Sequence, residues 1–538
     1  MATHYKTPGV YIQEPSSFPP SIVGVETAVP CFIGYTEKAV ELDGYDLHRV
    51  PRRINSMAEY VQIFGGAYLR KYYLAPDAVE ELASQDRNWG QVSLDGLNSY
   101  TLVEAGSIRF NLYHSMRLFY ANGGGPCYVI SVGDYGSAVG KAALLEGVAE
   151  CAGFIGPTMV AIPDAVLLSA GDAADVNVAM LQACRYLRDR MALIDIWGVE
   201  ELTGNQWESA IADFRAGIRA AGPESLQFGA AYFPPLVTAV VAPEDIAVTS
   251  FVTDDADKLA TLKLALRRAL AAKYPAPEPA GDVALSEQDE QFYANYIDKI
   301  GTSVAPPLPR DKPDPATLTH PNLTTALAAM VPGFAQLRAA IAATQNVLPP
   351  SGAMAGVWTT NDATRGVWNA PANTGIAALI QPKLPITGAQ QDDLNVPVDG
   401  LAVNAIRTFQ GRGTLVWGAR TLDSLSNDWR YIQVRRTVIY VEQSVKRALE
   451  TMVFKPNTAQ TWVTVTSMIE SFLHNLWAAG GLMGPTPGEA YNVRTGLGST
   501  MTADDVLNGV MRVQIMLQMV HPAEFITLSF DQQMMGDA

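Results

Sequence analysis

The sequence predicts a multidomain protein of mixed α and β structure (α+β or mixed α/β). The chain has 538 residues, more than one ordinary domain holds, so we expect two or three domains. Hydrophobic residues make up 48% and charged residues 17%, a composition typical of well-packed globular proteins. Residues 150–240 alternate apolar runs with helical patterns, which favours a parallel or mixed sheet covered by helices.

The first thirty residues cannot form a helix, because prolines interrupt them throughout. These prolines are Pro8, Pro15, Pro19, Pro20 and Pro30. Residues 9–13 form a short strand-like run between them, with little of its own to pack against. Such a strand is either disordered or pairs with the edge of another sheet. Residues 29–35 then predict a buried strand that ends at Gly34.

Residues 36–120 are mixed and rich in loops, with one clear helix start. Ser56 is the expected N-cap, since Glu59 follows it three residues later. Beyond them, the alternating region predicts four strands and two helices. The expected strands are 127–132, 158–162, 191–196 and 229–233, and the expected helices are 176–190 and 206–221.

The character of the chain changes at residues 241–320, which carry thirteen acids against eight bases and many prolines. An amphipathic helix is expected at about 254–273. We interpret about 241–330 as an insertion on an exposed face. Residues 346–373 are rich in Pro, Gly and Asn and predict a connecting segment.

The last 140 residues are regular again, with a strand at 413–420 and two amphipathic helices. The apolar face of the first helix holds Val438, Val441, Val445, Leu449 and Met452, and that of the second holds Trp462, Val465, Ile469, Phe472, Leu476 and Trp477. Gly480 and Gly481 stop the second helix. Residues 511–519 and 525–530 alternate with period two, so a strand is predicted near each end of the chain.

The bulk properties exclude several classes of protein. A net charge of −16 disfavours a free nucleic-acid binder. Neither a signal peptide nor an apolar run of membrane-spanning length is evident, so we expect synthesis in the cytoplasm and no membrane insertion. The four cysteines make no disulfide framework and are expected to be buried reduced thiols. They are Cys31, Cys127, Cys151 and Cys184.

A search for catalytic chemistry finds no constellation, so we predict no catalytic, cofactor-binding or metal site. None of the six histidines has metal-ligand spacing. Residues 136–141 resemble half of a phosphate loop, but the spacing is one residue short and Ala142 replaces the hydroxyl residue. Paired carboxylates, such as Asp504 and Asp505, suggest helix starts or solvated faces. The rival interpretation is a hydrolase on residues 150–240 that uses Asp164 or Asp195 at a strand end.

One region departs from the acidic average. Residues 401–455 hold nine bases and four acids. Salt bridges within the chain, an acidic partner surface and, more remotely, nucleic acid are the three explanations. The residues most suited to face a partner are Arg435, Arg436, Lys446, Arg447 and Lys455.

Several segments together resemble the contractile tail sheath family of phages and of phage-tail-like contractile injection systems. They are YKTPGVYIQE at 5–14, TAVPCFIGY at 27–35, PPSGAMAG at 349–356, RGVWNAPA at 365–372, VWGARTL at 416–422, WRYIQVRR at 429–436, FKPN at 454–457 and HPAEF at 521–525. The segments follow the family order over nearly the whole chain. Residues 32–39 and 56–60 favour an injection-system sheath over the alternative, a contractile bacteriophage tail sheath.

The resemblance implies a core domain made of an N-terminal arm (1–30) and the C-terminal part (376–538). An outer α/β region (31–375) would be inserted between them and carry the 241–330 insertion. The terminal strands would be exchanged between subunits, which generates assemblies that do not close. The exchanged residues would be Pro8, Gly9, Val10, Tyr11 and Ile12 at one end and Phe525, Ile526, Thr527 and Leu528 at the other.

The family's activity is structural. Subunits would stack as hexameric rings around an inner tube and contract to drive it through a target envelope, with no enzymatic step and no cofactor. The implied partners are other copies of the chain, the inner tube, a baseplate, a cap or terminator and, as an open alternative, a sheath paralogue. The basic residues named above would face the tube. Assembly would take place in the bacterial cytoplasm, with release of the particle or virion by lysis.

Overall fold

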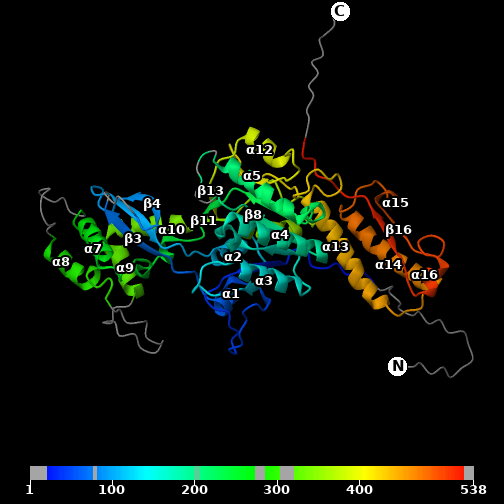
Figure 1. Ribbon diagram of the computed structural model, residues 1–538, viewed down its shortest axis with the longest axis horizontal. Helices are drawn as coiled ribbons and strands as arrows, with labels where there is room; N and C mark the ends of the chain where they lie inside the picture. Colours follow the sequence, from blue (N-terminus) through cyan, green and yellow to red (C-terminus); the bar gives the residue numbers. More distant parts are fainter. Residues whose placement is uncertain are drawn as a thin grey trace, which may run out of the picture. The chain divides into compact units, whose positions relative to one another are not determined.

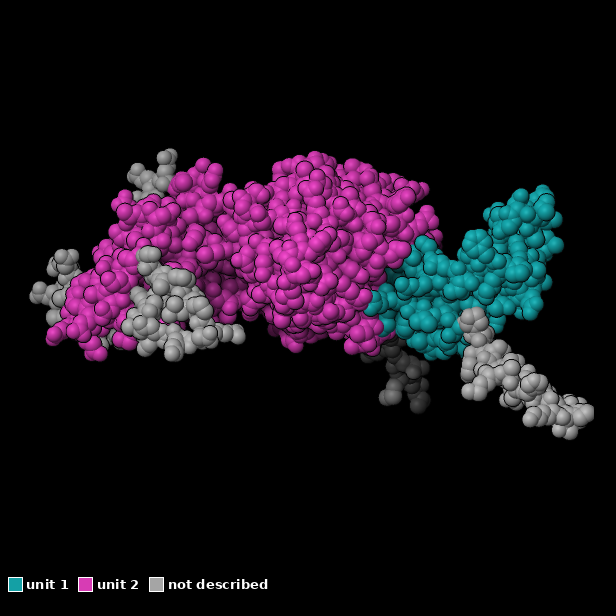
Figure 2. All heavy atoms as spheres, turned by 90° about the horizontal axis from the view of Figure 1, so that it is seen from below, with its two compact units in different colours: residues 1–26, 366–369, 436–538 teal, residues 27–365, 370–435 magenta. Residues whose placement is uncertain are grey.

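The structure is a computed structural model that describes residues 21–76, 82–199, 202, 204, 206–272, 285–302 and 320–525. The chain divides into two compact units, coloured separately in Figure 2. Unit 1 comprises residues 1–26, 366–369 and 436–538, and unit 2 comprises residues 27–365 and 370–435. Unit 1 therefore contains both ends of the chain.

Unit 2 is built on a nine-stranded sheet in the order β12-β15-β14-β9-β8-β7-β1-β6-β2. The strands are β1 (Pro30–Gly34), β2 (Arg52–Ile54), β6 (Cys127–Ser131), β7 (Met159–Ala161), β8 (Met191–Asp195), β9 (Gly229–Phe233), β12 (Thr374–Gly375), β14 (Asn404–Phe409) and β15 (Gly413–Val416). The six strands from β14 to β6 run parallel to one another. β15 pairs antiparallel with β14, β12 pairs antiparallel with β15, and β2 pairs antiparallel with β6. The predicted strands of the 29–35 and 127–233 region are confirmed.

Helices cover both faces of this sheet (Figure 1). Phe32 of β1 packs edge-on against Phe119 of α2 (Leu112–Ala121), whereas its neighbour Ile33 lies against Gly147 of α3 (Lys141–Ala152). Because successive side chains of a strand point to opposite faces, α2 and α3 lie on opposite sides. α4 (Ala170–Leu187) and α5 (Trp207–Ile218) continue the row of α3, and α11 (Ser351–Arg365) packs beside α2. All five β1 residues are consequently buried.

Helix α11 corrects the prediction of a connecting segment at 346–373. Its glycines were read as turn residues, but they allow close helix packing. A Cβ atom added to Gly352 would lie 2.6 Å from the carbonyl oxygen of Ser115 in α2, and one added to Gly356 would lie 2.7 Å from that of Phe119. Glycine is required where one backbone approaches another this closely. The helix also buries Trp358, whose Nε1 donates to the hydroxyl of Tyr232, 3.0 Å away.

A second core in unit 2 joins two segments that are far apart in the sequence. The antiparallel sheet β3-β5-β4, with strands β3 (Lys71–Pro76), β4 (Arg87–Val92) and β5 (Tyr100–Ala105), packs on α7 (Ala256–Ala271), α9 (His320–Met330) and α10 (Pro332–Gln345). Figure 1 shows β3 and β4 beside these helices. Leu262, Leu266 and Leu270 of α7 are buried there. The described part of 241–330 is thus half of a packed core, which corrects the expectation of a simple exposed insertion.

Shorter elements complete unit 2. They are α1 (Met57–Phe64), α6 (Pro223–Leu226), α8 (Glu287–Phe292), α12 (Gly388–Asn395), β10 (Leu236–Thr238), β11 (Val347–Leu348) and β13 (Leu379–Pro382). The predicted cap of α1 is confirmed, because the Ser56 hydroxyl accepts from the Glu59 backbone N–H, 3.2 Å away. Strands β14 and β15 extend the unit 2 sheet. Residues 376–435 therefore fall in unit 2, which corrects the predicted domain boundary at 376.

Unit 1 contains most of α13 (Ile432–Leu449), from Arg436 on, together with α14 (Ala459–Ala478), α15 (Pro487–Ala490), α16 (Ala503–Leu507) and the hairpin of β16 (Tyr491–Arg494) and β17 (Gln514–Leu517). The two predicted amphipathic helices are confirmed. Their buried residues Val441, Val445, Val465, Ile469 and Phe472 share one core with Ile22 from the other end of the chain. Met511, Val513, Ile515, Leu517 and Met519 pack on this core, which confirms the predicted period of two.

No single helix of the described ranges is long and apolar enough to cross a membrane. The pair α9 and α10 meets that criterion of length and composition only when taken together, with a bend of 115°. Leu323, Leu327, Phe334, Leu337 and Ile341 of this pair are buried in the second core, which accounts for their apolar character.

Candidate intersubunit surface

The two aspartates of the rival hydrolase interpretation cap helices. Asp164 follows β7 and is fully buried, and its carboxylate accepts from the backbone N–H groups of Tyr35, Asn111 and Leu112 at 3.0, 2.6 and 3.2 Å. It therefore holds the start of α2, where negative charge is favoured. Burial raises the pKa of Asp164 to about 6, although these hydrogen bonds act in the opposite direction.

Asp195 plays the matching role for α11. Its Oδ1 accepts from the backbone N–H of Ser351, the first residue of that helix, 2.8 Å away. Open α/β sheets bind ligands beyond the carboxyl ends of their parallel strands. In this structure the N-termini of α2 and α11 lie at that edge, beside the ends of β7 and β8. Both aspartates thus have a structural explanation.

The other sequence features that suggested chemistry also have structural partners. Lys141, at the end of the loop that resembles a phosphate site, pairs with Asp172 at 3.3 Å and with Asp175. Asp505 is the N3 residue of a capping box on α16, with Thr502 as N-cap. Among the residues that the structure describes, no group of three or more His, Cys, Asp or Glu side chains could hold a metal ion.

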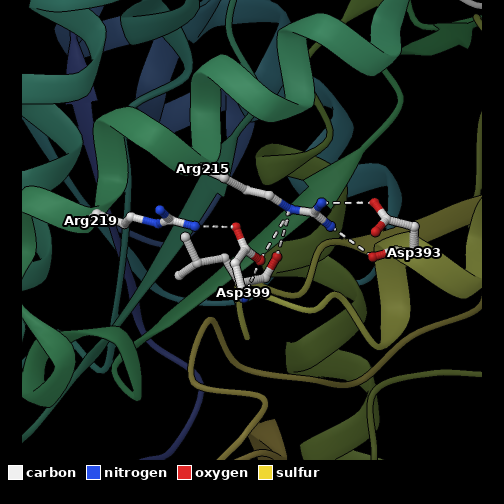
Figure 3. Close-up of polar contacts among 5 residues, drawn as sticks. Arg215, Arg219, Asp393 and Asp399 are labelled. Carbon is white, nitrogen blue, oxygen red and sulfur yellow. Dashed lines mark hydrogen bonds and ion pairs between the residues drawn. The ribbon is translucent and has the colours of Figure 1, made fainter.

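Asp393, which follows Asp392 in a further pair of adjacent carboxylates, belongs to a brace that holds the chain leading into β14 (Figure 3). Arg215 of α5 donates to the Asp393 carboxylate and carbonyl, each 2.8 Å away, and to the Leu401 carbonyl, 3.1 Å away. Arg219, one turn later, donates to the carboxylate of Asp399, 2.7 Å away. Charge-assisted bonds of this kind are stronger than neutral ones. The brace fixes a loop of unit 2 to a helix that lies far away in the sequence.

The candidate basic residues of 401–455 divide into two groups. Arg435 and Arg436 are buried, with 4% of each residue exposed. The Arg435 guanidinium lies 4.5 Å from the ring centres of both Phe228 and Trp429 and donates to the side-chain oxygen of Gln227, 3.2 Å away. Placing Arg435 and Arg436 on an exposed partner-facing surface is therefore wrong for this subunit. Of the two rings beside Arg435, Trp429 is six residues away in the sequence, whereas Phe228 lies in a distant segment.

Lys446, Arg447 and Lys455 are exposed, as the prediction requires. Lys446 and Arg447 lie in the last turn of α13, and Lys455 lies in the loop before α14. They can therefore meet an acidic partner, and whether they contact the tube stays a prediction.

The hairpin of unit 1 provides an open sheet edge. β16 and β17 pair antiparallel, with Asn492 opposite Met516, and the described residues add no third strand to this sheet. Exposed backbone groups along such an edge can pair with another chain. Of the predicted exchange residues, the structure describes only Phe525, whose side chain is exposed. Pro8, Gly9, Val10, Tyr11, Ile12, Ile526, Thr527 and Leu528 lie outside the described residues.

The chain resembles known sheath proteins over nearly its whole length. Residues 424–533 match the family model described as the phage tail sheath C-terminal domain. One similar structure is the contracted sheath complex of PVC, an extracellular contractile injection system. Its sheath chain is 26% identical to this chain, the match covers 99% of each chain, and the TM-score is 0.55. The contracted helical sheath of the anti-feeding prophage is 25% identical over 98% of this chain and 100% of that chain, with a TM-score of 0.55.

A structure of the anti-feeding prophage baseplate gives a similar match, with 25% identity, a TM-score of 0.54 and coverage of 98% of this chain and 100% of that chain. No curated protein matches the chain. Residues 424–533 thus match a tail sheath domain, and the whole chain resembles contractile sheath proteins. Its function as a contractile sheath subunit and its α+β multidomain fold are confirmed by these matches.

The exposed side chain of Phe454 was not predicted from the sequence. Phe454 belongs to the FKPN segment, which carried part of the family resemblance, but no role was assigned to it. It is the most exposed large apolar side chain among the described residues and has a positive φ of 68°. An aromatic residue directly before Lys-Pro, between two amphipathic helices, was the available signal.

Proposed function

We propose that this chain polymerises as stacked hexameric rings around an inner tube and contracts to drive the tube through a target envelope. The observation that carries the proposal is the end-to-end match to sheath structures in their contracted state. One of these two sheaths belongs to an extracellular contractile injection system, which favours an injection system over a phage tail. The mechanism requires no enzymatic step, because the energy is stored in the extended lattice at assembly.

Strand exchange links the subunits in this proposal. The open edge of the β16–β17 hairpin accepts the strands at 8–12 and 525–528 from neighbouring copies. Main-chain hydrogen bonds then hold the lattice while each subunit rotates as a nearly rigid body. A two-stranded sheet is marginal by itself, so added strands also stabilise unit 1. Pro15, Pro19 and Pro20 stiffen the arm beyond the paired residues.

Lys446, Arg447 and Lys455 face the inner tube in this arrangement. Contacts between exposed charges are weak and are screened by salt. They therefore hold the tube during assembly and still release it when the sheath expands. The further partners are a baseplate and a cap or terminator protein, and a sheath paralogue is an optional one. Assembly takes place in the bacterial cytoplasm, and lysis releases the particle.

Electron microscopy of the purified chain, with and without the tube and baseplate, tests the proposal. Hollow striated tubes are expected from the intact chain. Deletion of residues 1–15 should abolish them, because the donated strand is lost. A matched deletion of residues 531–538, beyond the predicted exchange strand, should retain them. If the intact chain stays monomeric even with tube and baseplate present, the sheath proposal is wrong.

The tube contact has its own test. The double variant Lys446→Glu and Arg447→Glu should still form empty striated tubes, because strand exchange is intact, but it should no longer assemble on the inner tube. The double variant Lys38→Glu and Lys299→Glu, which reverses two exposed bases of unit 2 away from the hairpin, is the charge control. Normal assembly of the first variant on the tube would refute the placement of these bases.

A further inference from the structure

Three of the four cysteines gather around one arginine of unit 2. Cys31 lies in β1, Cys151 in the last turn of α3 and Cys184 in the last turn of α4, and all three are buried free thiols. The charge of the Arg190 guanidinium, which comes just before β8, acts on each of them. Buried cysteines usually behave as small apolar residues, but a cation beside the sulfur makes a thiol reactive. The proposed function uses none of these thiols.

The packing of α3 on β1 brings Cys31 and Cys151 together. Gly147 of α3 lies so close to Ile33 of β1 that an added Cβ atom would clash with the Ile33 side chain. Cys31 is two residues from Ile33 and therefore points to the same face of the strand. Cys151 is four residues from Gly147 and therefore lies on the same face of the helix. The two cysteine side chains accordingly form a hydrogen bond with each other.

Arg190 fixes the position of Cys151 and places positive charge beside its sulfur. Its Nη1 donates to the Cys151 carbonyl, 2.6 Å away, and lies 3.4 Å from the Cys151 Sγ. Its Nη2 donates to the Phe154 carbonyl, 2.8 Å away. Asp189 binds the other side of the guanidinium, at Nε and Nη2, with distances of 2.6 and 3.0 Å. Nη1 is therefore left to the cysteine.

The two thiols of the pair differ in how readily they ionise. The Cys31 thiol and the Arg190 guanidinium lower the pKa of Cys151, although burial opposes them, whereas burial raises the pKa of Cys31. Cys151 therefore becomes a thiolate first, and the thiolate is the form that attacks an oxidant. Burial also raises the pKa of Cys184, which Cys151 influences through charge rather than through a hydrogen bond. Cys31 is thus the better placed partner for Cys151.

We propose that Cys31 and Cys151 form a disulfide bond when the chain meets hydrogen peroxide, and that this bond fastens β1 to α3. The oxidant is little larger than water, and Cys151 lies in the last turn of its helix, where helix ends open by fraying. A reducing cytoplasm keeps both thiols free, so the bond forms after the chain leaves that compartment. The inference goes beyond the proposed function and does not depend on it.

The oxidation takes place in two steps. The Cys151 thiolate attacks one peroxide oxygen, so that an S–O bond forms, the O–O bond breaks, and the departing hydroxide takes up a proton to become water. Cys31 then attacks the sulfur of the resulting sulfenic acid, the S–S bond forms, and the S–O bond breaks with loss of a second water. Together the two thiols lose two electrons and two protons, and one hydrogen peroxide is reduced to two waters.

Peptide mapping of the full-length chain tests the proposal. The reduced protein is treated with hydrogen peroxide, catalase removes the excess, and the remaining thiols are alkylated in denaturant. Digestion without reductant, with a protease that cuts between Cys151 and Cys184, precedes mass spectrometry. We expect one linked pair of peptides that joins Cys31 to Cys151, with Cys127 and Cys184 alkylated. Four alkylated cysteines, a bond from Cys151 to Cys184, or sulfinic acid at Cys151 without a bond would overturn the proposal.

Two substitutions assign the roles of the thiols. Cys31→Ala removes the second thiol, so peroxide should leave Cys151 as a sulfenic acid, which dimedone labels. Cys184→Ala is the matched control, because it removes another buried cysteine near Arg190 and should retain the bond. Absence of the label in Cys31→Ala, or of the bond in Cys184→Ala, would contradict these roles. The map of the intact chain decides even where a variant does not fold.

Thermal unfolding measures whether the bond fastens β1. The bond closes a loop of about 120 residues, so the oxidised chain should melt at least about 3 °C above the reduced chain, and a reducing agent should remove the difference. Peroxide-treated Cys31→Ala should show no such rise. An unchanged melting temperature of the disulfide-bonded chain would refute the fastening. Because these measurements need no lattice, their failure leaves the proposed function intact, and a failure of sheath assembly leaves this inference intact.

Discussion

The main sheet of unit 2 and the hairpin of unit 1 end in different edges. The nine-stranded sheet of unit 2 ends in β2, with three residues, and in β12, with two, and such short edge strands offer little for another chain to pair with. The hairpin of unit 1 is instead extended on either side of β17, since residues 511–519 keep one alternating pattern. The smaller β3-β5-β4 sheet of unit 2 also ends in longer strands, because β3 and β4 have six residues each. Short edges are therefore a property of the main sheet and not of unit 2 as a whole.

Side chains show a second difference between the units. Some buried polar side chains of unit 2 are held by several internal bonds. Asn404, for example, donates to the carbonyls of Ala231 and Arg420 and accepts from the Arg420 backbone N–H, at 3.0, 2.8 and 2.7 Å. Unit 1 leaves Phe454 and its neighbours in solvent. Exposed apolar side chains of this kind suit contacts between chains, which the proposed lattice requires.

The sharpest test of this contrast removes one aromatic side chain from each unit. Trp358→Ala should lower the free energy of unfolding by about 4 kcal/mol, because a fully buried ring and its hydrogen bond to Tyr232 are lost. Phe454→Ala should change it by less than about 0.5 kcal/mol, since the ring is exposed in the monomer. Urea denaturation of monomeric protein measures both. A large loss for Phe454→Ala would mean that the ring packs within its own chain.

The buried carboxylate of unit 2 should give a characteristic pH dependence. Burial raises the pKa of Asp164 to about 6, whereas an unfolded aspartate titrates near 3.9. Between these values the folded state binds more protons than the unfolded state. The contribution of Asp164 to stability is therefore full below about pH 4 and is lost as pH rises to about 6.

The Asp164→Asn variant isolates this contribution. Over that pH range, the intact chain should lose about 2 kcal/mol of unfolding free energy relative to the variant. Buried His114 acts in the opposite direction, because burial lowers its pKa to about 3 and acid then favours the unfolded state. The difference between the two proteins is therefore the quantity to measure, by denaturation at pH 4, 5 and 6. Parallel pH profiles would show that Asp164 does not titrate in this range.

The Arg215 brace should matter less than the buried ring. Arg215→Met keeps the aliphatic contact but removes the bonds to Asp393 and Leu401, so we expect a loss of about 2 kcal/mol. Arg219→Met removes only an exposed pair with Asp399 and should cost about 0.5 kcal/mol or less. Equal effects of the two substitutions would mean that the brace is not centred on Arg215.

Local signals in the sequence predicted much of this fold. The cap of α1 depends on Ser56 and Glu59, three residues apart, and the two helices of unit 1 follow from apolar residues on one face. The glycines of α11 needed information from α2, more than 200 residues away, so their composition was misread as a connection. Strands β3 to β5 were missed in a region read as mixed loops, because their core is supplied largely by α7, α9 and α10.

The site followed the same rule. Charge alone assigned Arg435 and Arg436 to a partner-facing surface. Trp429 lies six residues before Arg435, but the ring of Phe228, which is about 200 residues away, could not be seen as a neighbour in the sequence. The exposed bases Lys446, Arg447 and Lys455 carried the same charge signal. Burial separated the two groups, and burial depends on contacts between distant segments.

The smallest expected effect concerns the two faces of the β16–β17 hairpin. Ile515 packs on the core of unit 1, whereas its neighbour Met516 is exposed on the other face. Ile515→Ala should cost the monomer about 1 kcal/mol, because the side chain is only half-buried, and Met516→Ala should cost almost nothing. In assembled tubes, an effect of Met516→Ala on the critical concentration would show that subunits also cover this face. If Ile515→Ala leaves monomer stability unchanged, the hairpin is not held against α14 before assembly, and its order depends on strands from neighbouring copies.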